Sequence, residues 1–353
     1  MKILRALFEA ALSASINAKG EVEFPFGEST FSPVEVLQAD STAYDAEFRA
    51  WLNDVWLEHN RQRLQKLLKL YGNGGRFADL CSAVAIGYIV PVVGSGMSKP
   101  SGFPLWREFL HQLRQYTHIT DVELNRLLDE GRYEEAADVL LAQAGTHLFD
   151  ERIEHDLRVD IASRITGPVR FLGEIFPRLV LSTNLDDVLE CVYRSSDRAF
   201  AHVLIGRDIK RYRQLASTEK PILLKIHGDC HQKDGRVLGV AEYDIAYAPG
   251  SPAHQALELL CRTRGLLWMG SSLLMDRTVR LMGDFVSADP SGPRHFAFLR
   301  LPSEEARRID REQELSKGKI FPIWYDGDDD ESIEALLVGV LDRTGALASV
   351  DVT

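Results

Sequence analysis

The amino-acid sequence predicts an α/β fold built on a doubly wound, mostly parallel sheet, with a helical insertion and an N-terminal helical extension. Short apolar segments rich in β-branched residues recur from residue 88 onwards. Long helical or looped stretches separate them, as the crossover connections between parallel strands require. Turns containing glycine, asparagine or histidine follow several of these segments, at the positions where ligands bind in such sheets.

The first segment of the chain, residues 1–75, is predicted to be a helical extension. Its apolar residues recur at helical spacing in two groups, which are Leu4, Leu7, Phe8, Ala11 and Leu12, and then Tyr44, Phe48, Trp51, Leu52, Val55 and Trp56. The run Gly72 to Gly75 has no apolar periodicity and predicts a linker. An aromatic stripe of this kind indicates packing against the main domain or, as an alternative, contact with a like subunit or a partner.

Residues 76–353 are predicted to form the main domain. Tyr88 to Val93 is apolar and β-branched and runs into Gly94-Ser95-Gly96, which is typical of a buried parallel strand followed by a glycine turn. Helical periodicity over about 107–170 predicts an insertion. The strand pattern then resumes at Leu179 to Leu181, Ile222 to Ile226, Leu266 to Met269, Phe296 to Leu299 and Ile320 to Trp324. This alternation predicts a Rossmann-like sheet.

Charge and hydropathy restrict the class of protein. The formal net charge of −11 argues against a surface built to bind nucleic acid directly. The longest apolar run, Ala83 to Val93, is too short to cross a bilayer, and no signal peptide is evident. We therefore expect a cytoplasmic protein without membrane contact.

The four cysteines, Cys81, Cys191, Cys230 and Cys261, contain no Cys-x-x-Cys pair, which argues against a zinc ribbon or a disulfide framework. His227, Cys230 and His231 lie close together in the sequence and could hold a metal. Since no second ligand pair accompanies them, no metal is expected.

Two glycine-containing segments follow the first strand. In Gly94-Ser95-Gly96-Met97-Ser98, glycines would let the backbone approach a pyrophosphate, and a following helix would offer its N–H groups. The third glycine and the acidic residue of the usual dinucleotide fingerprint are not evident. Gly102-Phe103-Pro104, followed by Trp106, could form a wall of a cofactor cleft or a capping turn over the core.

Later strand ends carry polar groups. In Thr183-Asn184-Leu185-Asp186 a carboxamide and a carboxylate can face one cleft, although an Asx turn that caps the next helix explains them equally. His227, in a glycine turn, could take a proton from a sugar hydroxyl, or could be purely structural. Gly270-Ser271-Ser272 offers a further turn for a phosphate or a ribose.

Together these motifs resemble the sirtuin-like NAD⁺-consuming domains, and specifically their bacterial anti-phage defence branch. The resemblance runs from about Tyr88 to Leu341 and includes Asp276 after the Gly-Ser-Ser turn. It implies that NAD⁺ is the substrate and that Asn184, Asp186 and His227 are catalytic: Asn184 would position the ribose or water, Asp186 would hold the nicotinamide carboxamide, and His227 would be the general base. The implied cofactor-binding residues are Gly94, Ser95, Gly96, Ser98, Pro104, Trp106, Thr183, Gly270, Ser271 and Ser272.

The resemblance implies an NAD⁺ hydrolase that releases nicotinamide and ADP-ribose as the effector of a defence system. Regulation by homo-oligomerisation, or by a separate HerA-type ATPase or Argonaute-like protein, follows from the same analogy. The alternatives are a non-catalytic NAD⁺- or ADP-ribose-binding scaffold and, less favoured, a protein deacylase. The sequence lacks the four-cysteine zinc module of deacylating sirtuins, and Met97 replaces a small residue in the glycine turn.

Overall fold

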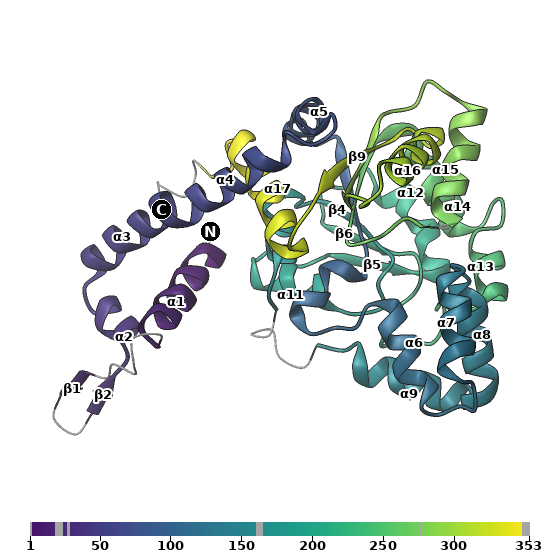
Figure 1. Ribbon diagram of the computed structural model, residues 1–353, viewed down its shortest axis with the longest axis horizontal. Coiled ribbons are helices and arrows are strands. Elements are labelled where there is room, and N and C mark those ends of the chain that lie inside the picture. Colours follow the sequence, from purple (N-terminus) through teal and green to yellow (C-terminus); the bar gives the residue numbers. More distant parts are fainter. Residues whose placement is uncertain (1, 18–23, 27–28, 160–164, 275–276, 348–353) are drawn as a thin grey trace.

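A seven-stranded parallel sheet forms the centre of the protein in a computed structural model, which describes residues 2–17, 24–26, 29–159, 165–274 and 277–347 (Figure 1). The strand order is β5-β6-β4-β3-β7-β8-β9, and every neighbouring pair is parallel. The strands are β3 (Ile89–Val93), β4 (Leu179–Ser182), β5 (His202–Ile205), β6 (Ile222–Lys225), β7 (Gly265–Met269), β8 (His295–Arg300) and β9 (Ile320–Tyr325). The predicted Rossmann-like α/β fold is therefore confirmed.

Both faces of the sheet are covered by helices, as a doubly wound fold requires. Side chains alternate along β9: Ile323 belongs to one hydrophobic core with α5, α11 and α17, whereas Trp324 belongs to the other with α14, α15 and α16. The helices of the main domain are α5 (Asn73–Ala85), α10 (Leu172–Ile175), α11 (Val188–Ser195), α12 (Tyr212–Leu215), α13 (Val240–Ala246), α14 (Pro252–Thr263), α15 (Arg277–Ala288), α16 (Glu305–Lys317) and α17 (Asp329–Arg343).

The topology places a crevice at the carboxyl end of β3. From β3 the chain builds β4, β5 and β6 on one side, and then returns to add β7, β8 and β9 on the other. This reversal of direction separates the turns after β4 and β7 and creates the position where doubly wound sheets bind ligands.

The insertion lies between β3 and β4 and has its own hydrophobic core. It consists of α6 (Trp106–Arg114), α7 (Asp121–Asp129), α8 (Tyr133–Ala144) and α9 (Thr146–Asp156). Leu185, from the turn after β4, and Cys230, from the turn after β6, belong to the same core. The insertion therefore packs directly on two of the strand-end turns that carry the predicted site residues.

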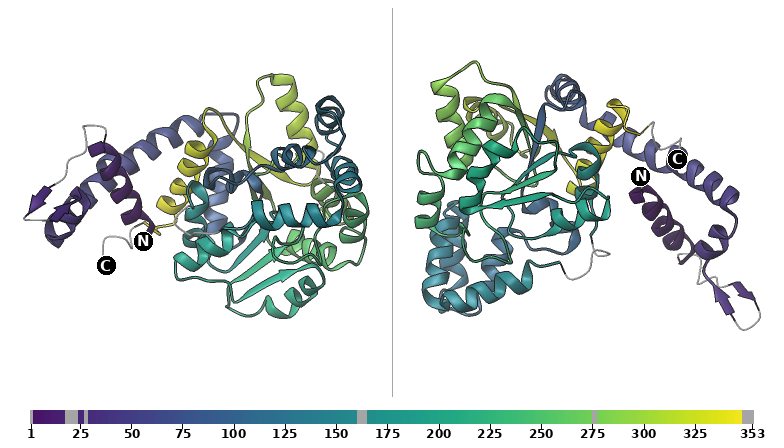
Figure 2. Two further views of the ribbon diagram at one scale, coloured as in Figure 1. Left: turned by 90° about the horizontal axis from the view of Figure 1, so that it is seen from below. Right: turned by 180° about the vertical axis from the view of Figure 1, so that it is seen from behind.

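The N-terminal segment forms an arm that projects from the main domain (Figures 1 and 2). It contains α1 (Lys2–Asn17), a hairpin of β1 (Phe24–Phe26) and β2 (Ser29–Phe31), α2 (Pro33–Gln38), α3 (Ser41–Ala50), a π-helical stretch η1 (Trp51–Leu57) and α4 (Glu58–Leu67). Its last part is anchored on α17, where Trp56 Nε1 donates to Glu334 at 3.0 Å and Arg61 pairs with Asp342 at 3.2 Å. At the start of the arm, Lys2 on α1 forms an ion pair with Asp197 of the main domain.

The predicted linker at Gly72 to Gly75 is wrong. Gly72 has a φ of 73°, but α5 begins at Asn73 and includes the next two glycines. The Asn73 side chain is buried and bonds to Leu67 O at 2.7 Å and to the backbone of Trp324 on β9. These tertiary hydrogen bonds, which no local pattern reveals, hold the glycine run in a helix.

Among the described helices, none combines the length and the apolar character needed to cross a lipid bilayer.

Candidate active site

A small cavity lies at the carboxyl ends of β3, β4 and β6, where the topology places the crevice. Its volume is about 170 Å³. Seven of the predicted site residues line it: Ser95, Pro104, Trp106, Thr183, Asn184, Asp186 and His227. The sequence analysis missed the remaining lining residues, which are Phe109, Leu157, Leu185, Val237, Leu238 and Tyr243. Except for Tyr243 these residues are apolar. A search for polar groups directly after strands therefore could not identify them.

The glycine turn after β3 packs against the turn after β7. A Cβ on Gly94 would lie 2.6 Å from Gly270 O, and a Cβ on Gly96 would lie 2.8 Å from Gly270 Cα. Gly270 itself has a φ of 69°, and Gly96 N–H donates to its carbonyl at 2.8 Å. These three glycines allow two backbones to approach each other.

A helix was expected to follow the glycine turn directly, and this expectation is wrong. Two short 3-10 turns, η2 (Ser95–Met97) and η3 (Lys99–Ser101), come first, and α6 begins only at Trp106. No long helix among the described residues therefore points its dipole at the glycine turn. Of the turn residues Gly94 to Ser98, only Ser95 lines the cavity.

Ser98 joins two of the predicted catalytic side chains. It is 1% exposed, its hydroxyl accepts from Asn184 Nδ2 at 3.1 Å, and it is hydrogen-bonded to the Asp186 carboxyl group. The Asn184 backbone N–H donates to Ser182 Oγ at 3.0 Å. Ser98 thus holds the side-chain amide of Asn184, and Ser182 holds its backbone N–H. Ser98, which was predicted to bind phosphate, is not among the residues that line the cavity.

Asp186 has two roles in the structure. One carboxylate oxygen accepts from Val188 N at 3.1 Å, as the Asx-turn interpretation predicts, and the side chain also lines the cavity. Burial raises its pKa to about 6, although the nearby Lys225 ammonium and the Ser98 hydrogen bond both oppose this change. Near neutral pH this carboxyl group is poised between its two protonation states.

A buried ion cluster supports the turn that carries Asp186. Lys225 is 1% exposed and donates to Asp186 O at 2.8 Å, to Glu190 Oε1 at 2.9 Å and to Asp229. Burial opposes the charge on Lys225, but the two carboxylates raise its pKa above the usual value. This lysine therefore stays charged and ties the turns after β4 and β6 together.

His227 lines the cavity from the turn after β6. Its Nε2 lies 2.7 Å from the hydroxyl of Tyr247, and the imidazole makes a further hydrogen bond to the backbone of Thr183. Burial lowers the pKa of His227 to about 4. The imidazole is therefore neutral at pH 7, the form in which it can accept a proton.

Residues 178–323 match the family model of the SIR2-like domain. This match supports the resemblance to sirtuins and an NAD-related activity. It includes Asn184, Asp186 and His227, whereas the glycine turn after β3 and the insertion lie before it. No match was found among the curated proteins.

The structure brings together a different set of candidate metal ligands from the one that the sequence analysis weighed, His227, Cys230 and His231. Among the described residues, Asp187, Cys230 and His231 bring one ligand atom each within 4.8 Å of one another, whereas His227 points to Tyr247. His231 Nε2 lies 3.0 Å from Asp187 Oδ2, and Val159 N–H donates to Asp187 Oδ1 at 2.6 Å. Burial raises the pKa of the Cys230 thiol, which disfavours the thiolate that a metal needs.

The turn after β7 lies outside the cavity. Ser272 is exposed, and its carbonyl accepts from Arg311 Nη2 at 2.8 Å, while the Ser271 hydroxyl accepts weakly from Leu273 N–H at 3.4 Å. The fold thus does not bring Gly270, Ser271 and Ser272 to the cavity that Asn184 lines. Asp276 lies outside the described residues.

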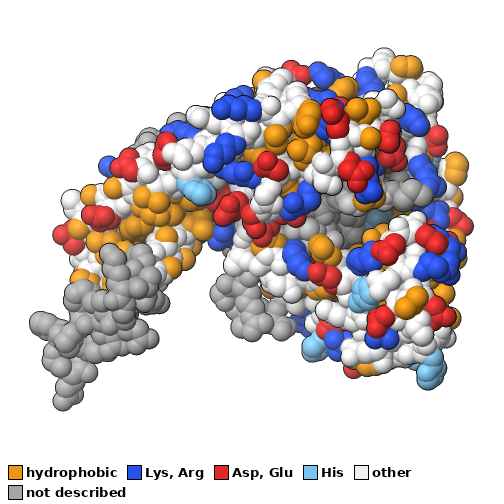
Figure 3. Space-filling view, viewed as in Figure 1, with side chains coloured by type: hydrophobic (Ala, Val, Ile, Leu, Met, Phe, Trp, Pro, Cys, Tyr) orange, Lys and Arg blue, Asp and Glu red, His pale blue; other side chains and the backbone are white. Residues whose placement is uncertain are grey.

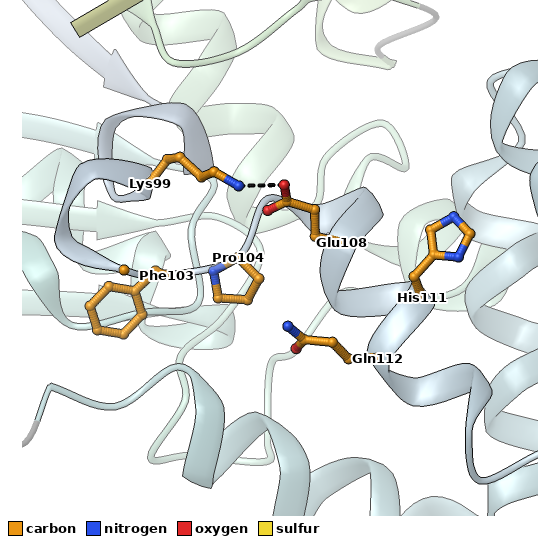
Figure 4. Close-up of a pocket in the computed structure, with 7 residues that line it drawn as sticks. Lys99, Phe103, Pro104, Glu108, His111 and Gln112 are labelled. Carbon is orange, nitrogen blue, oxygen red and sulfur yellow. Dashed lines mark hydrogen bonds and ion pairs between the residues drawn. The ribbon is translucent and has the colours of Figure 1, made fainter.

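A larger groove of about 550 Å³ adjoins the cavity on the side of the insertion (Figure 4). Its lining consists of Lys99, Gly102, Phe103, Pro104, Glu108, His111 and Gln112. Lys99 and Glu108 form an ion pair within it, and Pro104 lines both spaces. The predicted Gly-Phe-Pro segment therefore forms a wall between the cavity and an open groove.

Proposed function

We propose that this protein is an NAD⁺ glycohydrolase that cleaves the nicotinamide–ribose bond. The observation that carries the proposal is the convergence of Asn184, Asp186 and His227 on one cavity at the topological switch point. The SIR2-like match over 178–323 is compatible with NAD⁺ as the substrate.

The side chains suit this reaction in kind and in protonation state. Nicotinamide leaves as a neutral molecule, so the site must stabilise an oxocarbenium-like ribose and admit a water. Because Asn184 Nδ2 donates to Ser98, the amide oxygen is the group that orients the water or a ribose hydroxyl. Asp186 would hold the nicotinamide carboxamide, and neutral His227 would accept the proton that the attacking water loses.

The size of the cavity bears on how NAD⁺ is bound. Typical ligand pockets have volumes of about 300–1,000 Å³, whereas this cavity measures about 170 Å³. The space matches the nicotinamide–ribose half of the dinucleotide better than the whole molecule. We propose that the remainder extends past Pro104 towards the adjoining groove, or that the cavity widens on binding.

A second candidate function is a non-catalytic NAD⁺- or ADP-ribose-binding scaffold. The specific observation in its favour is that a protein hydroxyl, from Tyr247, already contacts the nitrogen of His227 that a base would use. Protein deacylation is less favoured, because the four cysteines lie scattered and buried and offer no zinc module.

The defence role and its partners are proposals that rest on the resemblance. An NAD⁺ hydrolase must be kept inactive in its host, and we propose that homo-oligomerisation or a separate HerA-type ATPase or Argonaute-like protein regulates it. The projecting arm is a candidate contact surface, since hydrophobic side chains gather on the face shown in Figure 3. Val55 and Val36, both in the arm, are 57% and 43% exposed.

The test is incubation of the purified chain with NAD⁺, alone and with its neighbouring gene product, while nicotinamide is quantified. We expect turnover that is abolished in Asn184→Ala and His227→Ala. Asn53→Ala and His118→Ala, which change the same residue types at exposed positions, should retain it. NAD⁺ binding by calorimetry without turnover under any of these conditions would support the scaffold and refute the hydrolase.

A further inference from the structure

Two protein groups are hydrogen-bonded to the His227 ring. The Tyr247 hydroxyl lies 2.7 Å from Nε2, and the ring also bonds to the backbone of Thr183. The contact with Thr183 raises the pKa of the ring, as a hydrogen bond from a ring N–H to a backbone carbonyl does. In the neutral imidazole only one nitrogen carries a proton. We therefore assign the proton to Nδ1 and the lone pair to Nε2, so that Tyr247 is the donor in the 2.7 Å contact.

This arrangement matters because a general base acts through its lone pair. A ribose hydroxyl or a water can transfer a proton to Nε2 only if it takes the place of the Tyr247 hydroxyl. That hydroxyl is itself supported from behind, since it lies 3.2 Å from Oγ1 of Thr278, a residue that is 2% exposed.

Tyr247 directly follows α13 and belongs to an aromatic group that includes Tyr243 of this helix. Tyr243, one helical turn earlier, lines the cavity and packs edge-on against the His227 ring, with centroids 5.1 Å apart. The two tyrosine rings stack at 5.9 Å. A movement of α13 would therefore displace a wall of the cavity and the donor to Nε2 together.

Two polar ties join α13 to α8 of the insertion. At the start of α13, Val240 N–H donates to Asp138 on α8 at 3.1 Å. Further along, Arg277 bridges Glu134 on α8 and Asp244 on α13, at 2.7 Å and 2.5 Å. The position of α13, and so of Tyr247, depends on where the insertion lies.

We propose that Tyr247 masks the base in the resting protein, and that withdrawal of α13, released from α8, exposes His227 Nε2 to the substrate. The expected effect on NAD⁺ turnover rests on the proposed function. The masking of His227 by Tyr247 does not, because it is a property of these two side chains. The insertion thereby gains a role in controlling the site, since the polar ties on α8 hold the mask in place.

The direct test is Tyr247→Phe, which keeps the ring and removes the hydroxyl. Two quantities are measured on the purified full chain: nicotinamide release from NAD⁺, and the rate at which diethyl pyrocarbonate acylates His227, followed by peptide mass spectrometry. Glu134→Gln, which keeps Tyr247 and weakens the tie to α8, is the second variant. Tyr71→Phe, at an exposed tyrosine 45% accessible to solvent, is the matched control.

We expect Tyr247→Phe to raise both the acylation rate of His227 and NAD⁺ turnover by about fivefold, the factor that the loss of one competing neutral hydrogen bond supplies. Glu134→Gln should raise both by a smaller factor, and Tyr71→Phe should change neither. Faster acylation of His227 in the test variants, without nicotinamide release in any variant, would support the masking of His227 and refute the proposed NAD⁺ hydrolase activity. Unchanged acylation in both test variants, or turnover that falls in Tyr247→Phe, would overturn the mask.

Discussion

Ser98→Ala tests whether the hydroxyl positions the site or binds phosphate. In the structure this side chain is 1% exposed and bridges the Asn184 amide and the Asp186 carboxyl group. The substitution removes both hydrogen bonds and adds no bulk. If the hydroxyl instead met the NAD⁺ diphosphate, its loss would weaken substrate binding and leave the chemical step intact.

The expected size of the effect follows from the two groups left unpaired. An unsatisfied buried polar group costs about 1–3 kcal/mol, and a charged one costs more. Two such groups would cost about 2–6 kcal/mol together. Because Asn184 and Asp186 both line the cavity, water can replace part of what is lost, and we expect a destabilisation of about 2 kcal/mol, the lower end of that range. A carboxamide displaced by about 1 Å at a reacting centre lowers the rate by about 100-fold.

Urea unfolding, kcat and KM for nicotinamide release, and the pH profile of kcat measure these effects, with the exposed Ser316→Ala as the control. The Ser98 hydrogen bond favours the ionised form of Asp186. Its loss should therefore raise the pKa of that carboxyl group above about 6 and move the corresponding limb of the profile to higher pH. A rise in KM with kcat and the profile unchanged would show that Ser98 binds phosphate and that the positioning argument is wrong.

Two further predictions concern stability. Asn73→Ala should lower the free energy of unfolding in urea by about 3–5 kcal/mol, because it leaves the backbone partners at Leu67 and Trp324 unpaired; a loss no greater than that of Asn53→Ala would contradict this. Burial lowers the pKa of His295 from 6.5 to about 3, so below pH 6.5 the unfolded chain takes up a proton that the folded protein does not. The free energy of unfolding in urea should then fall by about 2 kcal/mol between pH 6.5 and 5. His295→Asn keeps an acceptor for Leu266 N–H and should remove this contribution to the pH dependence of the free energy of unfolding.

The sequence predicted the sheet well because buried parallel strands are continuous apolar runs. The six predicted strands occur within one or two residues of their expected bounds. The seventh, β5, is an edge strand paired only with β6, and Val203 in it is 38% exposed. The sequence analysis missed this strand, although Val203-Leu204-Ile205 is as apolar as the predicted strand Leu179 to Leu181.

The candidate site was predictable where it follows from topology. Asn184 and His227 lie directly after strands, and parallel strands bring their carboxyl ends to one edge of the sheet, so their convergence could be inferred from order alone. The roles of Gly94 and Ser98 could not be inferred from the sequence. Each depends on a partner far along the chain, Gly270 for the first and Asn184 for the second, and local glycine and serine patterns do not identify such partners.

Access to the cavity and availability of the base depend on the same parts of the structure. Trp106 and Phe109 of α6 and Leu157 after α9 line the cavity from the insertion, while Tyr243 lines it from α13. A cavity of about 170 Å³ must enlarge, or open into its neighbouring groove, to take a whole dinucleotide. Any displacement of α8 that enlarges it also loosens the ties through Asp138 and Arg277 that hold Tyr247 on His227. Substrate entry and unmasking of the base would then occur in one movement, and a partner that stabilises the open form would need to bind the insertion more tightly in that form than in the closed one.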